Sequence, residues 1–177
     1  IHLLKNLPGF DPRRWLTGFT NYRFLIPHLT QGCGRAIYND VDQVYLRDPA
    51  DLFDCEMERH GYLSINPRDT SVMLIDAARM LPVWPLDSIK NSRRKRLERR
   101  AADTPALWGE LDPGWNARDT EYQCGKSNLV HFTTIHTQPW MPFPLRFIYQ
   151  TNPVAGLWND LEQGALSAGF TPFSEAQ

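Results

Sequence analysis

Two aspartates, Asp40 and Asp42, follow an apolar run, residues 36–38, that predicts a short buried strand. In an extended chain, residues i and i+2 lie on the same side, so both carboxylates can face one point in space. Two carboxylates this close repel each other unless a cation lies between them, and Mg²⁺ or Mn²⁺ suits such hard oxygen ligands. Because most Asp-X-Asp pairs in proteins are solvated turns or helix caps, the assignment depends on what surrounds this one.

The surroundings of the pair favour a ligand site. A helix start follows at Asp48 and Pro49, with the aspartate as N-cap and the proline in the first turn. In open α/β sheets, ligands bind outside the carboxyl ends of strands, which is where the two aspartates are expected. His131 lies at the end of a second apolar run, residues 128–132. A histidine there is more often a packed side chain than a ligand, yet a strand-end imidazole is also a reasonable third metal ligand.

The segment around the aspartates resembles the central motif of the family-8 glycosyltransferases. Residues 37–42 read Ile-Tyr-Asn-Asp-Val-Asp, and residues 46–54 read Leu-Arg-Asp-Pro-Ala-Asp-Leu-Phe-Asp. In that family a strand ends in Asp-X-Asp and leads into a Leu-X-Asp-Pro-X-Asp/Glu-Leu-Phe segment. The resemblance implies an α/β fold of the GT-A type, with a mixed sheet flanked by helices. Because the family's nucleotide-binding half before Asp-X-Asp is largely absent here, we expect the domain to be incomplete at its N-terminus.

A second segment resembles the family's His-(Phe/Tyr)-X-Gly-X-X-Lys-Pro-Trp motif, matched by His131, Phe132, Pro139 and Trp140. The resemblance implies that His131 completes, with the aspartate pair, a site for Mn²⁺ or Mg²⁺. It also implies a donor contact at Gln138, which stands where the family has a lysine that touches the β-phosphate. An amide can donate a hydrogen bond to phosphate, but a charge-assisted bond would be about twice as strong. His136, in a loop one residue longer than the family's, is expected to supply the missing cation.

Three further residues are expected to contact substrate because of the resemblance. Arg23 interrupts an aromatic stripe in a predicted helix, where the family has a basic residue that touches the donor; a guanidinium that reaches solvent from the edge of that face is the alternative. Asp69 stands where the family's sugar-contacting Asn-Ala-Gly element lies, although an aspartate in a turn is the commoner explanation. Trp115 would wall the sugar pocket, with core packing as the commoner alternative.

The remaining pattern predicts the elements around these residues. Helices are expected over residues 11–27, 49–57 and 152–169, and strands over 61–65, 71–75 and 147–149. The basic run 92–100 is interpreted as a solvated helix face, because no aromatic side chains interleave with its charges to stack on bases. We expect residues 1–177 to form a single domain, the catalytic and acceptor part of a GT-A-like glycosyltransferase.

The composition argues against several classes of protein. With 19 Lys and Arg against 20 Asp and Glu, the net charge is −1, which argues against a general binder of nucleic acid or anionic membranes. No apolar run in the sequence reaches the length of about 18 residues that a transmembrane helix requires. Since no signal-peptide pattern stands at the start, we expect a cytoplasmic protein, free or peripheral to a membrane.

The first hypothesis for the function is a metal-dependent glycosyltransferase. It would transfer a hexose from a nucleotide-diphospho-sugar to a carbohydrate or glycoconjugate acceptor, and the resemblance implies a UDP-sugar donor and retention of configuration. No residue is identified as nucleophile or base. A non-catalytic nucleotide-sugar-binding or regulatory module on the same fold is the alternative, supported by the uncharged Gln138. Metal-dependent phosphoester hydrolysis is a weaker hypothesis, because a two-metal site normally needs more acidic or histidine ligands.

Overall fold

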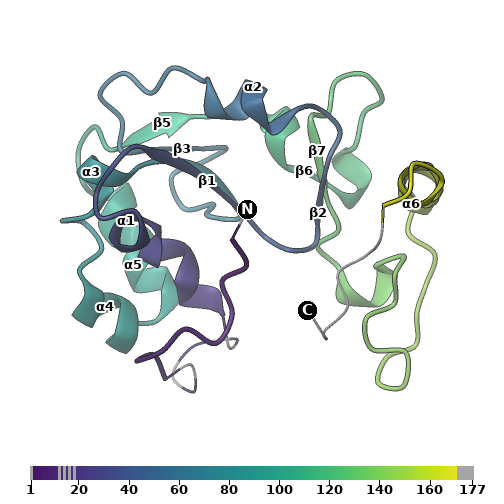
Figure 1. Cartoon of the computed structure of the whole chain (residues 1–177), viewed down its shortest axis with the longest axis horizontal. Helices are drawn as coiled ribbons and strands as arrows, with labels where there is room; N and C mark the ends of the chain where they lie inside the picture. The colour runs from purple at the N-terminus through teal and green to yellow at the C-terminus, as the bar shows by residue number, and fades with distance from the viewer. Residues whose placement is uncertain (1, 12, 14, 16, 18, 171–177) are drawn as a thin grey trace.

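The larger of two sheets contains four strands in the order β1-β4-β3-β5 (Figure 1). The computed structural model describes residues 2–11, 13, 15, 17 and 19–170. The strands of this sheet are β1 (Arg35–Asn39), β4 (Val72–Asp76), β3 (Tyr62–Ser64) and β5 (Trp108–Glu110). β1 and β3 both run antiparallel to β4, whereas β5 runs parallel to β3. The sheet is therefore mixed, as the sequence predicts.

The strand β4 carries the core of this sheet on both of its faces. Met73 and Ile75 belong to one hydrophobic cluster, whereas Val72 and Leu74 belong to another. This division follows from strand geometry, because successive side chains point to opposite faces. A strand covered on both faces reads as a continuous apolar run, and this explains why the strand was recognisable without an alternating pattern.

Short helices cover the first of these clusters. They are η2 (Thr20–Leu25), α1 (Ile26–Leu29), α3 (Ala77–Met80), α4 (Leu86–Asn91) and α5 (Arg94–Ala102). Figure 1 shows α1, α4 and α5 gathered on the same side of the larger sheet. Ile89 of α4 and Leu97 of α5 bury their side chains in the cluster that contains Met73. These helices therefore pack against one face of the larger sheet.

A smaller sheet has the strand order β2-β7-β6. Its strands are β2 (Gln43–Tyr45), β7 (Leu129–His131) and β6 (Ala117–Arg118). β2 runs antiparallel to β7, with Gln43 opposite His131. The chain leaves β1 at Asn39 and enters β2 at Gln43. The intervening residues 40–42 therefore cross from the larger sheet to the smaller one.

The second cluster joins the two sheets. α2 (Pro49–Phe53) contributes Leu52 to it, η3 (Pro113–Asn116) contributes Trp115, and β7 contributes Leu129. As predicted, α2 begins after Asp48, whose carboxylate accepts a hydrogen bond from the backbone N of Ala50 at 2.8 Å. These packed side chains fix the smaller sheet against the face of β4 that carries Leu74.

The C-terminal part adds η4 (Asp119–Glu121), η5 (Ile135–Thr137) and α6 (Ala155–Ser167). Figure 1 shows α6 at the far end of the molecule from α4 and α5. Trp158 of α6 packs against Trp140, with ring centroids 4.7 Å apart, and against Phe132 after β7. Gly169 ends the helix with a φ of 83°, a left-handed conformation that suits glycine.

Several of the predicted elements differ in the structure. In place of a continuous α-helix over 11–27, η2 is a 3₁₀-helix that leads into α1, and Pro27 lies in the first turn of α1. A proline there costs little, because its missing N–H would have no helical partner anyway; residues 12, 14, 16 and 18 of the prediction lie outside the described residues. Residues 147–149 form no strand, and α6 begins at Ala155, three residues later than predicted.

None of the helices that the structure describes combines the length and the apolar character needed to cross a lipid bilayer.

Candidate metal centre

The pairing of β2 with β7 brings His131 to the aspartate pair. Because Gln43 lies opposite His131, the residue before Gln43 lies beside the imidazole, and Nε2 of His131 is 3.2 Å from Oδ1 of Asp42. The backbone N of Phe132 donates to the backbone O of Asp42 at 2.9 Å and extends this register. One ligand atom from each of Asp40, Asp42 and His131 lies within 4.8 Å of the others. The structure thus brings together the three residues expected to hold a metal.

A buried arginine holds the first aspartate in place. Nη2 of Arg23 donates to Oδ1 of Asp40 at 2.8 Å, and the guanidinium side chain is only 3% exposed. Arg23 also donates to the backbone oxygens of Thr70, at 2.7 Å, and Thr20, at 3.0 Å. Three partners in fixed positions leave the guanidinium little freedom. In this structure Arg23 therefore contacts the Asp40 carboxylate, and its predicted contact with the donor stays a prediction.

Tyr38 is a second partner of the same carboxylate. Its hydroxyl donates to Oδ1 of Asp40 at 2.6 Å, and its ring lies 4.7 Å from the Arg23 guanidinium carbon. Burial raises the pKa of Tyr38 far above its usual range, with a further contribution from the negative charge of Asp40. The hydroxyl therefore keeps its proton and remains a donor. Because Tyr38 and Arg23 both bind Oδ1, Oδ2 is the oxygen that Asp40 offers to a cation.

A chain of polar side chains fixes the orientation of the imidazole. Oδ1 of Asn116 lies 2.8 Å from Nδ1 of His131, while Nδ2 of Asn116 donates to Oδ2 of Asp69 and to Oγ of Ser71. Because the amide nitrogen faces a carboxylate, the amide oxygen must face the histidine. The Asn116 oxygen is the nearest partner of Nδ1, so this contact favours a proton on Nδ1 and leaves Nε2 as the nitrogen that can bind a cation. Gln43, whose amide nitrogen is 3.1 Å from Nδ1, packs against the same edge of the ring.

Asp69 lies at the far end of this chain. Its carboxylate forms an ion pair with Arg118 and accepts a hydrogen bond from Asn116, and it is only 8% exposed. It also accepts from the backbone N of Ser71 at 3.0 Å. In this structure Asp69 therefore orients Asn116, and its predicted contact with a sugar stays a prediction.

A polar cavity of about 440 Å³ opens beside the three residues. Asp40 and His131 reach its wall, together with hydroxyl, carboxylate and guanidinium groups from Asp69, Thr70, Ser71, Arg94, Arg118 and Thr133. Such a lining offers many donors and acceptors and little apolar surface. The cavity therefore suits a hydroxylated and charged ligand.

The other predicted contacts fall in different surroundings. Gln138 is buried, and its amide nitrogen donates to the backbone O of Phe132 at 2.9 Å and to Oδ2 of Asp42 at 3.3 Å. His136 is exposed on η5. Trp115 is 5% exposed and packs in the cluster shared by the two sheets. Donor contacts of Gln138 and His136, and a sugar contact of Trp115, stay predictions.

Several residues of the centre were not identified from the sequence. Tyr38 had a signal, because it stands in β1 two residues before Asp40, a spacing that places both side chains on the same side of an extended chain. Asn116 directly follows Trp115, and only the packing of η3 against β7 reveals that its side chain reaches His131. Arg118 reaches Asp69 across 49 residues of sequence, a contact that no local pattern encodes.

No protein-family model matches the sequence, and no curated protein matches it. Solved glycosyltransferases match its fold. GlyE of Streptococcus pneumoniae TIGR4 aligns over 88% of this chain at 12% identity, with a TM-score of 0.54. The galactosyltransferase LgtC, in complex with donor and acceptor sugar analogs, aligns over 91% at 10% identity with a TM-score of 0.56. An active-site mutant of LgtC aligns over 95% at 12% identity with a TM-score of 0.59.

The chain spans 48% of the GlyE chain and 70% and 73% of the two LgtC chains. At such identities the likeness shows the fold alone. With its mixed sheet and flanking helices, the chain has the GT-A-like α/β fold of these glycosyltransferases.

Proposed function

We propose that this chain binds a nucleotide-diphospho-sugar together with a divalent cation and takes part in transfer of the sugar to a carbohydrate or glycoconjugate acceptor. The observation that carries the proposal is the convergence of Asp40, Asp42 and His131, within 4.8 Å, on a glycosyltransferase fold. A UDP-sugar donor, a hexose and retention of configuration are the finer parts of the proposal, supported by the resemblance of the two motifs.

The donor atoms fit a divalent cation. Two carboxylates and one neutral imidazole form a mixed set of oxygen and nitrogen ligands that suits Mn²⁺. The carboxylate oxygens also suit Mg²⁺. Asn116 Oδ1 accepts from Nδ1 of His131 in the tautomer that a metal ligand requires, in which Nε2 carries the lone pair. Oδ2 of Asp40 is the oxygen not bound by Arg23 or Tyr38. The chain therefore supplies three ligands already aimed at one place.

A cation bound there would stabilise the negative charge that develops on the diphosphate as the sugar leaves. The protein's own residues prepare the place for it. Arg23 and Tyr38 orient Asp40 by donating to its Oδ1, and Gln138 donates to Oδ2 of Asp42. His136, exposed on the loop of η5, is the side chain proposed to add positive charge near the phosphates. The polar cavity beside Asp40 is the proposed place for the sugar.

The test is the effect of Asp42→Ala on Mn²⁺-dependent binding of UDP, followed by titration calorimetry. We expect UDP affinity in the presence of Mn²⁺ to fall by about a hundredfold or more, since loss of even an indirect partner of a metal ligand costs about 10–100-fold. Asp54→Ala removes an exposed carboxylate outside the centre and serves as the control with unchanged affinity. Equal affinity of Asp42→Ala and the wild-type protein would refute the metal assignment.

One observation supports the non-catalytic alternative. Gln138 is uncharged and its amide is occupied by Asp42 and the backbone of Phe132. Incubation of the protein with UDP-sugars, Mn²⁺ and varied acceptors, followed by detection of free UDP, separates the two functions. Release of UDP supports glycosyl transfer, whereas tight binding of the UDP-sugar without release supports a binding or regulatory module.

A further inference from the structure

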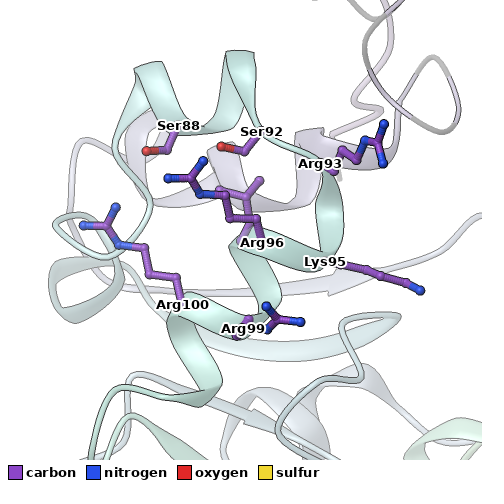
Figure 2. A pocket seen from close by; sticks show the side chains of 8 residues that line it. Ser88, Ser92, Arg93, Lys95, Arg96, Arg99 and Arg100 are labelled. Atoms are coloured by element: carbon purple, nitrogen blue, oxygen red, sulfur yellow. The ribbon is translucent and has the colours of Figure 1, made fainter.

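The solvent side of α5 is covered with basic side chains. Lys95, Arg96, Arg99 and Arg100 of α5, and Arg93 directly before the helix, are all exposed, and we call them the α5 basic surface (Figure 2). The opposite side of the helix carries Leu97 and Ala101, which are buried in the core. The division into a basic and an apolar side shows that packing fixes the helix and leaves the cations in water.

The α5 basic surface lines a shallow concavity of about 750 Å³ between α4 and α5. Ser88 and Ser92 form its other wall. Figure 2 shows Arg96 and Arg100 extending on the side of these serines, whereas Lys95 points away from them. The cations therefore spread over an area and do not converge on a single point.

These charges are not compensated by neighbouring acids. Arg94 pairs with the buried Glu98 at 2.8 Å, and Asp103 after α5 lies 3.7 Å from Arg68. Within the part of the chain that the structure describes, no ion pair involves the five residues of the α5 basic surface. The acidic residue of the neighbouring helix α4 is the exposed Asp87, in its first turn. Since the net charge of the whole chain is −1, the rest of the molecule is acidic.

We propose that the α5 basic surface docks the protein onto an anionic phospholipid bilayer. Clusters of four to eight basic side chains on one helix bind anionic headgroups, and each contributes about 1 kcal/mol near the surface. A negatively charged plane attracts this one face and repels the acidic remainder, so the contact also sets the orientation. Arginine, which makes up most of the surface, matches phosphate oxygens with two parallel hydrogen bonds.

Two other anionic partners fit less well. Single-stranded nucleic acid needs aromatic side chains on which its bases stack, and among the described residues none of those that line the concavity is aromatic. A small phosphate ion would be met by side chains that converge, whereas the basic side chains here spread apart over the nine residues of α5. A plane of many headgroups matches a spread of separate charges.

The position of α5 links this surface to the candidate metal centre. Arg94 lines the polar cavity that contains Asp40, while Arg93 and Lys95, its neighbours in sequence, line the basic concavity. A bilayer bound to the α5 basic surface would therefore lie next to the cavity. If the proposed function holds, the acceptor is then a glycoconjugate embedded in that membrane; the docking itself does not depend on the proposed function.

The test is sedimentation of the full chain with phosphatidylcholine vesicles, with and without phosphatidylglycerol. We expect binding to the phosphatidylglycerol vesicles alone, lost at high salt because the attraction is screened. The double variant Arg96→Gln, Arg100→Gln should lower the partition coefficient by about twentyfold or more, since each basic side chain contributes about fivefold. A matched control, Arg47→Gln with Arg59→Gln, removes two exposed arginines elsewhere and should change binding by less than about twofold.

Thermal unfolding of both double variants checks that each remains folded. If the arginine double variant does not fold, Lys95→Gln alone takes its place, with an expected fall in the partition coefficient of about fivefold. Three outcomes would overturn the proposal: equal binding to neutral vesicles, an equal loss in the control pair, or tighter binding to duplex DNA than to vesicles of equal phosphate concentration. Variants of the candidate metal centre such as Asp42→Ala should bind vesicles like the wild-type protein, so failure of the proposed function leaves this test intact.

Discussion

At the scale of single residues, the ion pair between Arg23 and Asp40 joins a buried side chain to a partly exposed one. The arginine is 3% exposed and the aspartate 19%. Replacing Arg23 by methionine should lower the free energy of unfolding by about 3 kcal/mol, because the carboxylate loses its countercharge in a buried place. Urea unfolding with and without Mn²⁺ measures the loss, and we expect Mn²⁺ to recover part of it, because a cation again faces Asp40.

A double-mutant cycle separates the ion pair from packing. In the Asp40→Asn background, Arg23→Met should cost clearly less than in the wild-type protein, since the buried charge is already gone. An equal cost in both backgrounds would mean that Arg23 stabilises the fold through Thr70 and Thr20 alone.

Asn116 is the residue through which Asp69 acts on His131. Asn116→Leu removes the oxygen that accepts the Nδ1 proton, and we expect the affinity for Mn²⁺ to fall by about 10–100-fold. Asn116→Asp keeps an oxygen at that place and should bind Mn²⁺ more tightly than the leucine variant. Titration calorimetry with Mn²⁺ alone measures the affinity, and ¹⁵N chemical shifts of His131 report the tautomer. Unchanged affinity in Asn116→Leu would show that β7 alone positions the imidazole.

At the scale of elements, the parallel pair β3 and β5 depends on a glycine. A Cβ placed on Gly109 would lie 2.5 Å from Cδ2 of Leu63 and 2.7 Å from the ring of His60. Leu63 is 4% exposed and has little room to move. Gly109→Ala should therefore destabilise the protein by about 1–3 kcal/mol, as urea unfolding would show.

A glycine in α6 supplies the matched control. A Cβ on Gly164 meets nothing within 4 Å, and the residue lies inside a helix of 13 residues. Gly164→Ala should therefore stabilise the protein by about 0.5–1 kcal/mol, because alanine loses less conformational freedom on folding. A loss of stability in both variants would mean that the clash at Gly109 is not the cause.

The elements also show what the sequence could and could not predict. The strands β4 and β7 were predictable, because continuous apolar runs mark strands covered on both faces. β2 and the two-residue β6 carry no such run, and their pairing with β7 depends on contacts distant in sequence. The three candidate metal ligands could be named from their motifs. The register that brings them together, with Gln43 opposite His131, could not.

At the scale of the whole molecule, wholly and partly buried tyrosines make stability depend on pH. Burial raises the pKa of Tyr45 from 10.0 to about 12, and it also raises the pKa of Tyr38 and of Tyr62 above the usual range. The unfolded chain loses these protons at lower pH than the folded chain. Stability is therefore full below pH 10 and falls as the pH rises through the interval from 10 to 12.

Urea unfolding on either side of this interval measures the fall, and tyrosinate absorbance follows the ionisation. Tyr45→Phe should remove its own share of the slope, about 1–2 kcal/mol after allowance for the part of the side chain that water reaches. A slope that is the same in Tyr45→Phe and in the wild-type protein would assign the effect to Tyr38 and Tyr62.

Although Asp40 and Asp42 are only two residues apart, their backbones are hydrogen-bonded to segments of different sheets. The backbone N of Asp40 donates to the backbone O of Ser71, next to β4, whereas the backbone O of Asp42 accepts from Phe132, next to β7. The spacing of the carboxylates thus follows the angle between the sheets. By thermodynamic linkage, a ligand that binds both carboxylates also stabilises the packing between the two sheets. A substitution that changes this packing, even far from the carboxylates, therefore changes the affinity for that ligand.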